Sequence, residues 1–206
     1  MAGFGTVAAV ALSVREQLNR CFVAMDEANE DAFRARPVAR LVQTTDFAKI
    51  NADADNPIRF PTLSIFVWRV DINRATRAPW AAVAAQDGTI HLPLDVHLLL
   101  TAWDSDIENE LRMIGATMQC LEARPVLAGP RLHPSGGWRP GEAVQIVNED
   151  LVTEDVLRTF ETLPVDYRLS VAYLARVARI DAPAEPGHPD VLAAVRGLSP
   201  SSASLP

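Results

Sequence analysis

The stretch "HLPLDVHLLLTAW", residues 91–103, decides the fold, because its apolar residues recur at every second position. That period of two is typical of a β-strand with one buried face. The apolar set is Leu92, Leu94, Val96, Leu98 and Leu100. The next residues, "DSDIENELRMIGATMQCLEARP", change to helical spacing and predict a helix directly after the strand.

This helix has recognisable ends. Asp104 or Asp106 offers an N-cap, and Pro125 ends the helix because the residue before a proline disfavours helical backbone. The spacing of four and three residues predicts one apolar stripe along it. The stripe consists of Ile107, Leu111, Ile114, Met118 and Leu121.

Two further strands flank this unit. Residues 62–72, "TLSIFVWRVDI", are β-branched and aromatic, and apolar on both faces in their first half, which predicts a central strand. Residues 167–180 alternate, with Arg168, Ser170 and Arg176 on the polar face. This segment is long for a strand, so we expect a bend or an edge position, and an edge would accept an extended arm of a partner by strand addition.

The remaining segments complete an α+β pattern. Residues 4–25 predict a long amphipathic helix, and residues 153–163 a short one with Val156, Leu157, Phe160 and Leu163 facing inward. Residues 26–57 predict a long, mostly irregular linker with room for short ordered pieces. The expected fold is a single domain over residues 1–181, with a mixed, mostly antiparallel sheet packed with helices, followed by a flexible proline-rich tail at 182–206.

Composition excludes several classes of protein. The net charge of the 206-residue chain is −7 without a basic block, which argues against a nucleic-acid partner, and no apolar run is long enough to span a membrane. Lys49 is the single lysine, so arginine supplies the other basic residues, which suits protein interfaces or reflects genomic composition. Cys21 and Cys120 occupy positions typical of a helix core, which predicts reduced thiols in a cytoplasmic protein.

Asp95 and His97 are the residue pair in the sequence that could best form part of a catalytic site. On one strand face their side chains are about 7 Å apart, too far for a base and its orienting carboxylate. They are therefore read as a solvated or neighbour-paired strand face, or as a surface that another protein covers, with a catalytic site as the weakest reading. The histidines lack metal-ligand spacing and no nucleotide-binding motif is present, so we expect no metal and no cofactor.

Two loop tryptophans are candidates for a protein-binding surface. Trp80 and Trp138 are flanked by arginine, a composition found at binding hot spots, although a loop tryptophan folded back onto its own domain is equally compatible. With Asp95, His97, Arg168, Ser170 and Arg176, they form the candidate interface set.

The order of three motifs resembles a known family. Leu94-Asp95-x-His97-x-Leu99-x-Thr101 comes first, then Glu110-Leu111 with Gly115 in a helix ending in "RPVL", then "YRLS" at 167–170. Together, over roughly residues 7–181, they are similar to the N-terminal domain of cap, or tail-terminator-like, proteins of extracellular contractile injection systems. Where that family commonly has a second aromatic residue after the first motif, this chain has Leu98 and Leu99.

The resemblance implies a structural protein and not an enzyme. Members are expected to form a six-fold, homo-hexameric ring that terminates the inner tube and anchors the last sheath layer, at the end distal to the baseplate. The implied partners are further copies of the chain, the tube protein and the sheath protein. Two alternatives stay open: an assembly chaperone for tube or sheath subunits that is absent from the finished particle, and a hydrolase that uses Asp95 and His97.

Overall fold

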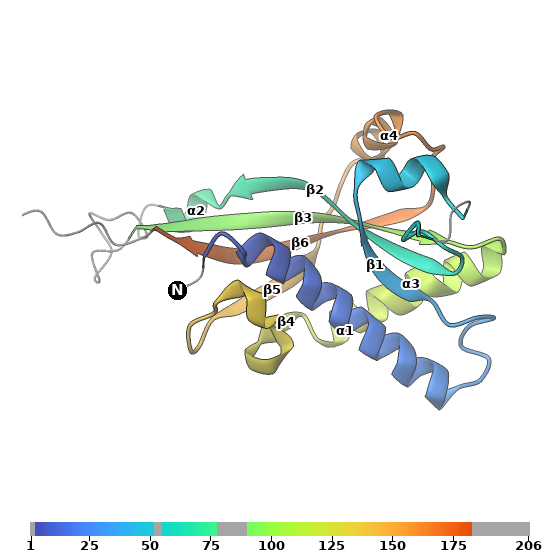
Figure 1. Ribbon diagram of the computed structural model, residues 1–206, viewed down its shortest axis with the longest axis horizontal. Coiled ribbons are helices and arrows are strands. Elements are labelled where there is room, and N and C mark those ends of the chain that lie inside the picture. The colour runs from blue at the N-terminus through green and yellow to red at the C-terminus, as the bar shows by residue number, and fades with distance from the viewer. Residues whose placement is uncertain (1–2, 52–54, 78–89, 183–206) are drawn as a thin grey trace, which may run out of the picture.

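The computed structural model describes residues 3–51, 55–77 and 90–182 (Figure 1). Within these residues a six-stranded sheet has the order β1-β2-β3-β6-β5-β4. The strands are β1 (Val38–Val42), β2 (Thr62–Ile72), β3 (His91–Trp103), β4 (Val126–Ala128), β5 (Ala143–Asn148) and β6 (Ser170–Asp181). Strand β1 pairs with β2 in parallel and the other pairs are antiparallel, which confirms the predicted α+β class with a mixed, mostly antiparallel sheet.

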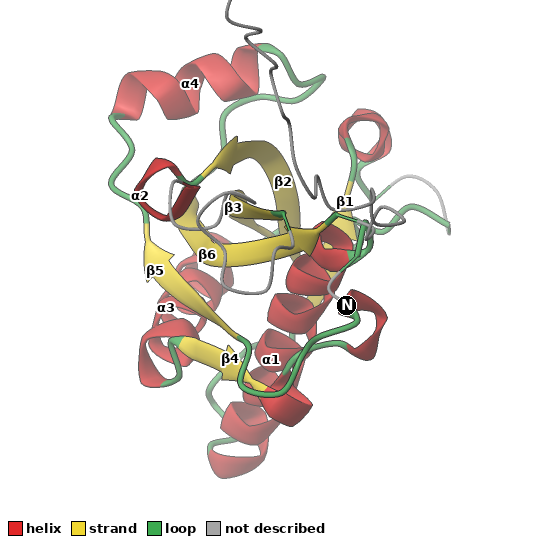
Figure 2. Ribbon diagram, turned by 90° about the vertical axis from the view of Figure 1, so that its left-hand side faces the viewer, coloured by secondary structure: helices red, strands yellow, loops and turns green. Residues whose placement is uncertain are grey.

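Helices cover both faces of the sheet. The α-helices are α1 (Thr6–Ala28), α2 (Arg74–Arg77), α3 (Ile107–Ala123) and α4 (Thr153–Glu161), and the 3-10 helices are η1 (Thr44–Lys49), η2 (Gly129–Arg131) and η3 (Pro134–Gly136). Figure 2 shows the curled sheet with α1 and α3 on one side and α4 on the other. One apolar core lies under α1 and α3, around Leu98 and Leu100, and a second lies under η1 and α4, around Trp103 and Phe160.

The strand predictions are confirmed for β2 and β3, whose bounds agree with the sequence pattern. Strand β6 differs, because it lies inside the sheet: it pairs with β3 along its length and with β5 at Tyr173–Arg176. The expected edge position is therefore wrong, and an arm cannot add to β6 where β5 already occupies its backbone groups. Its length is accommodated by a register shift opposite Leu94 and Val96 of β3.

Segment 26–57 contributes more structure than a linker, since it contains β1 and η1. At the outer edge of β1, the Asn19 side chain of α1 accepts a hydrogen bond from the Ala39 N–H at 2.8 Å and donates one to the Ala39 carbonyl at 3.1 Å. The amide thereby replaces the neighbouring strand that an edge lacks. Five residues are too few for their periodicity to stand out in the sequence, so β1 was not predicted.

Helix α3 begins where expected, but it buries a different face. The side chain of Asp106 is its N-cap and accepts the Glu108 N–H. Burial acts to raise the pKa of the neighbouring Asp104, but hydrogen bonds from Asn109 and from nearby backbone groups outweigh it and lower this pKa below its ordinary value. Of the predicted apolar stripe, Ile114 and Leu121 are buried, whereas three residues are exposed: Ile107, Leu111 and Met118.

The cysteine prediction is wrong. Cys21 of α1 and Cys120 of α3 form a disulfide that joins residues 99 positions apart in the sequence. Packing of α1 against α3 brings their Cα atoms to 6.1 Å, within the range that a disulfide spans. The apolar pattern correctly predicted that both cysteines face the core, with Cys120 buried and Cys21 partly buried, but it carries no information on which helices touch.

Candidate interaction surface

Asp95 and His97 lie side by side on β3, yet each has its own partner. Both carboxylate oxygens of Asp95 accept hydrogen bonds from the Asn73 side-chain amide, at 3.1 and 3.0 Å. Nδ1 of His97 lies 2.8 and 2.9 Å from the two carboxylate oxygens of Glu149. The two residues are thus not a base and its orienting group, which removes the geometric basis of the catalytic reading.

His97 stands at the centre of a charged cluster that joins β2, β3 and the end of β5. Its Nε2 is 3.4 Å from an Asp71 oxygen, and a guanidinium nitrogen of Arg69 lies 3.3 Å from the same ring nitrogen. Arg69 also pairs with Asp71 at 2.9 Å, and its guanidinium carbon lies 4.9 Å from the centre of the Trp68 ring. His97 itself is only 4% exposed, so a partner would meet Arg69 and Asp71 and not the imidazole.

The other predicted residues divide into structural and exposed ones. Arg168 pairs with buried Glu110 at 2.8 Å and stacks over Trp103, and the Ser170 hydroxyl is 2.7 Å from that of Thr101. Arg176 is exposed and donates to Gln145 at 3.4 Å. The Arg168 side chain is 40% exposed despite this pairing, so Arg168 and Arg176 are both open to a partner, whereas Ser170 is half-buried.

The loop tryptophans do not form the expected pair of hot spots in the described residues. Trp138 donates its indole N–H to the His133 carbonyl at 2.7 Å and packs against the first core. A Cβ at Gly136 would lie 2.4 Å from the indole ring, so only glycine fits beneath it. Trp138 thus folds back onto its own domain, while Trp80 lies outside the described residues.

Helix α3 carries an exposed apolar surface, formed by residues of the stripe that the sequence predicted as buried. Ile107 is 64% exposed, Leu111 53% and Met118 39%, and nothing lies within 4 Å of a Cβ built on Gly115 between them. The sequence of α3 also contains the stripe that the structure buries. This second stripe is formed by Met113, Thr117, Cys120 and Leu121. Asn109 and Glu110 are also buried on that face. Because these two residues are polar, the sequence pattern did not indicate this face as the buried one.

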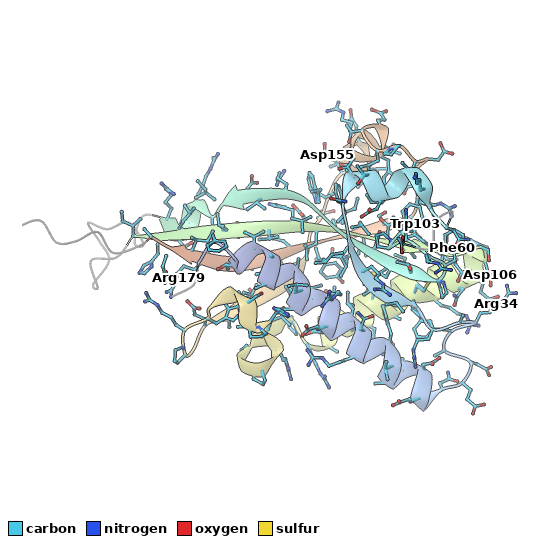
Figure 3. All side chains as sticks on the ribbon, viewed as in Figure 1. Arg34, Phe60, Trp103, Asp106, Asp155 and Arg179 are labelled. Carbon is cyan, nitrogen blue, oxygen red and sulfur yellow. A yellow bond between two sulfur atoms is a disulfide. The ribbon has the colours of Figure 1, made fainter. Side chains whose placement is uncertain are left out.

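Charged side chains line a cavity of about 390 Å³ at the end of the molecule near α3. Arg34 and Asp106 lie together there, 3.7 Å apart (Figure 3). Among the described residues, no group of three or more His, Cys, Asp or Glu side chains is placed to hold a metal ion. In the same part of the chain, no helix combines the length and apolarity that a membrane crossing requires.

Comparison with solved structures shows what this fold is similar to. The chain is similar to the PVC sheath/tube terminator of an extracellular contractile injection system, in its extended state: 18% identity, a TM-score of 0.50, and coverage of 92% of this chain and 64% of that one. It also resembles the tube-terminating cap of the anti-feeding prophage, with 14% identity, a TM-score of 0.48, and 86% and 60% coverage. This chain therefore spans less than two thirds of either protein.

The first likeness confirms the tail-terminator-like fold predicted from the motifs. No protein of curated function matches the sequence. The family model of the Pvc16 N-terminal domain, however, matches residues 9–193, which is most of the chain. The chain belongs to the Pvc16 N-terminal domain family.

Proposed function

We propose that this chain is a cap subunit of a contractile injection particle, which forms a hexameric ring on the end of the inner tube and anchors the last layer of sheath. The observation that carries this proposal is family membership over residues 9–193, supported by the terminator-like fold. Its partners are further copies of itself, the tube protein and the sheath protein. It would be made in the cytoplasm and retained in the extracellular particle.

The exposed surfaces suit repeated subunit contact. A ring of identical subunits needs two unlike faces on each copy, because its contacts are head to tail. The apolar stripe of Ile107, Leu111 and Met118 on α3 supplies one candidate face, since an exposed group of large apolar side chains commonly marks a protein contact. Arg176, exposed in the middle of β6, is a candidate polar contact.

The test compares particles from a producing strain with and without this chain. Purified particles should contain the chain at about six copies each, the number of a closed hexameric ring. Without it, tubes and sheaths should vary in length or lack a terminal density in electron micrographs. Particles that are free of the chain and still uniform in length would indicate the chaperone alternative and overturn the cap assignment.

A variant pair links this function to α3. Leu111→Glu places a charge in the exposed apolar stripe, and Leu111→Met keeps its size and polarity. Because Leu111 is 53% exposed, both variants should fold. The Glu variant should be depleted from particles while the Met variant is retained, as measured by quantitative mass spectrometry. Equal retention of both variants would show that this stripe is not a contact of the ring.

A further inference from the structure

Strand β2 is covered along only half of its outer edge. Strand β1 pairs with residues 62–66 of β2, while β2 itself continues to Ile72. In Figure 1 the second half of β2 runs away from β1, together with β3 and β6, as a three-stranded arm. The four residues 69–72 are all exposed. We refer to the outer side of residues 70–72 as the free edge.

The direction of the backbone groups at the free edge follows from the pairing. The Asn73 N–H donates to the Pro93 carbonyl across the β2–β3 ladder, so residue 73 and, by alternation, Asp71 and Arg69 face β3. The N–H and C=O groups of Val70 and Ile72 therefore point away from β3. None of these outward groups has a hydrogen-bond partner among residues 3–51, 55–77 and 90–182.

The other edges of the sheet near this arm are protected. Asn19 occupies the backbone groups of Ala39 at the edge of β1. On the far side of the arm, beyond the last residue that pairs with β5, β6 is held to residues 139–142 by ion pairs. Arg139 pairs with Asp181 at 2.9 Å, and Arg179 pairs with Glu142. Natural sheets protect edges in this way against unwanted pairing, so an edge left open is informative.

The free edge is also held rigidly. Asp95 accepts hydrogen bonds from the side chain of Asn73, the first residue after β2. His97 and Glu149 surround Arg69, and Arg69 pairs with Asp71 on the face opposite Val70 and Ile72. The Asp95 and His97 motif thus fixes the backbone of β2 in an extended shape, which lowers the conformational entropy that an added strand must overcome.

The side chains define the chemistry of the occupant. Val70 and Ile72 are 42% and 45% exposed and extend the buried layer formed by their neighbours Val96 and Leu94 on β3. An added strand that alternates would lay apolar residues beside them. Beyond Ile72, the short helix α2 carries Arg74 and Arg77, both exposed and without an ion pair in the described residues. They favour acidic residues where the added strand begins, if it runs antiparallel to β2.

We propose that the free edge of β2 is the docking site for an extended segment of a second protein, which adds as an antiparallel strand and has acidic residues followed by alternating apolar ones. The partner is defined by this chemistry and not by the cap function, so the proposal is tested on the isolated chain and stands or falls separately.

The probe is a labelled, acetylated peptide of sequence Glu-Glu-Thr-Val-Thr-Val-Thr, measured by fluorescence anisotropy. It should bind with a dissociation constant below about 1 mM, which is accessible to a short strand with few hydrogen bonds. The same peptide with both valines N-methylated lacks the donors that reach Val70 and Ile72, and it should lose at least about tenfold in affinity. Equal binding of the two peptides, or no binding of either, overturns the proposal.

The protein variants are Ile72→Pro and Ile72→Val. Proline removes the outward N–H of residue 72 and leaves the β2–β3 ladder bonds intact, whereas valine keeps the N–H. The proline variant should retain its circular dichroism spectrum and lose peptide binding, and the valine variant should keep both. If the proline variant instead turns a dimer of the isolated chain into a monomer, the occupant is a second copy, and the assignment to a different protein is wrong.

Amide exchange gives a readout that does not depend on the variants. In the free chain, the amides of Val70 and Ile72 should exchange quickly and those of Arg69 and Asp71 slowly, since only the second pair faces β3. The peptide should slow the first pair alone. Slow exchange at Val70 and Ile72 in the free monomer would show that the chain already covers this edge, which overturns the proposal.

Discussion

Among single residues, His97 has the environment that the sequence indicated least clearly. Its alternation with Asp95 predicted an outward strand face, but Glu149, 52 positions away, covers it. Since Nδ1 lies within hydrogen-bond distance of both Glu149 oxygens, this nitrogen carries the proton and donates it. The strand face was therefore predictable from the period of two, while its cover by a residue after β5 depended on the pairing of strands.

Replacing Glu149 tests how much this contact stabilises the fold. Glu149→Gln keeps the shape and removes the charge from a hydrogen bond to a nearly buried ring, so we expect a loss of about 1–3 kcal/mol in unfolding free energy, measured in urea. Glu154→Gln is the matched control, because Glu154 pairs with Arg158 at the surface and contributes about 0.5 kcal/mol or less. Equal stability of the two variants would contradict a structural role for His97 and Glu149.

Tyr173 gives the chain a specific sensitivity to alkaline pH. Burial, with the nearby Glu122 carboxylate, raises its pKa from 10.0 to about 12. Between these values the unfolded chain loses the phenol proton while the folded chain keeps it, so a rise in pH favours unfolding, with a limiting slope of about 1.4 kcal/mol per pH unit. Because the unfolded phenol is only half ionised at pH 10, the native chain should lose about 1 kcal/mol relative to Tyr173→Phe between pH 10 and 11 in urea titrations. Parallel stability curves for both proteins would show that the phenol ionises alike in both states.

The helices and strands were predictable to different degrees. Strands β2 and β3 followed from period-two patterns long enough to be unambiguous. Helix α3 was predicted in its extent but not in its orientation, because Ile107, Leu111 and Met118 form one apolar stripe and Met113, Cys120 and Leu121 another. A helix with two apolar stripes buries the one that meets its neighbours, and the identity of those neighbours is a property of the tertiary fold.

Strand β1 depends on a side chain from another element, which makes it a good test of edge protection. Asn19→Ala leaves the N–H and C=O of Ala39 without partners, so we expect a loss of about 1–2 kcal/mol in unfolding free energy. Asn19→Asp keeps the acceptor for the N–H and loses the donor to the carbonyl, and it should fall between the native chain and the alanine variant. An alanine variant as stable as the native chain would mean that water replaces the Asn19 amide without cost.

Across the whole chain, features set by local sequence patterns were predictable, and features set by contacts between distant elements were not. Local patterns gave the fold class and its order of elements, and the motifs placed the chain in its family. The disulfide was not predictable, because a free buried cysteine and a paired one occupy the same position in an apolar stripe. What distinguishes them is the contact between α1 and α3, which are separated in sequence by β1, β2 and β3.

The disulfide between Cys21 and Cys120 should dominate the stability of the isolated domain. It closes a loop of about 100 residues, for which the chain-entropy model gives roughly 4–5 kcal/mol, with native strain as an opposing term. Dithiothreitol should therefore lower the thermal midpoint of the native chain. It should leave the double variant Cys21→Ala and Cys120→Ala unchanged, since that variant has no bond to reduce. The count of free thiols in denatured, unreduced protein provides the decisive control: two per chain would mean that the pair is a dithiol, and that α1 and α3 are held by packing alone.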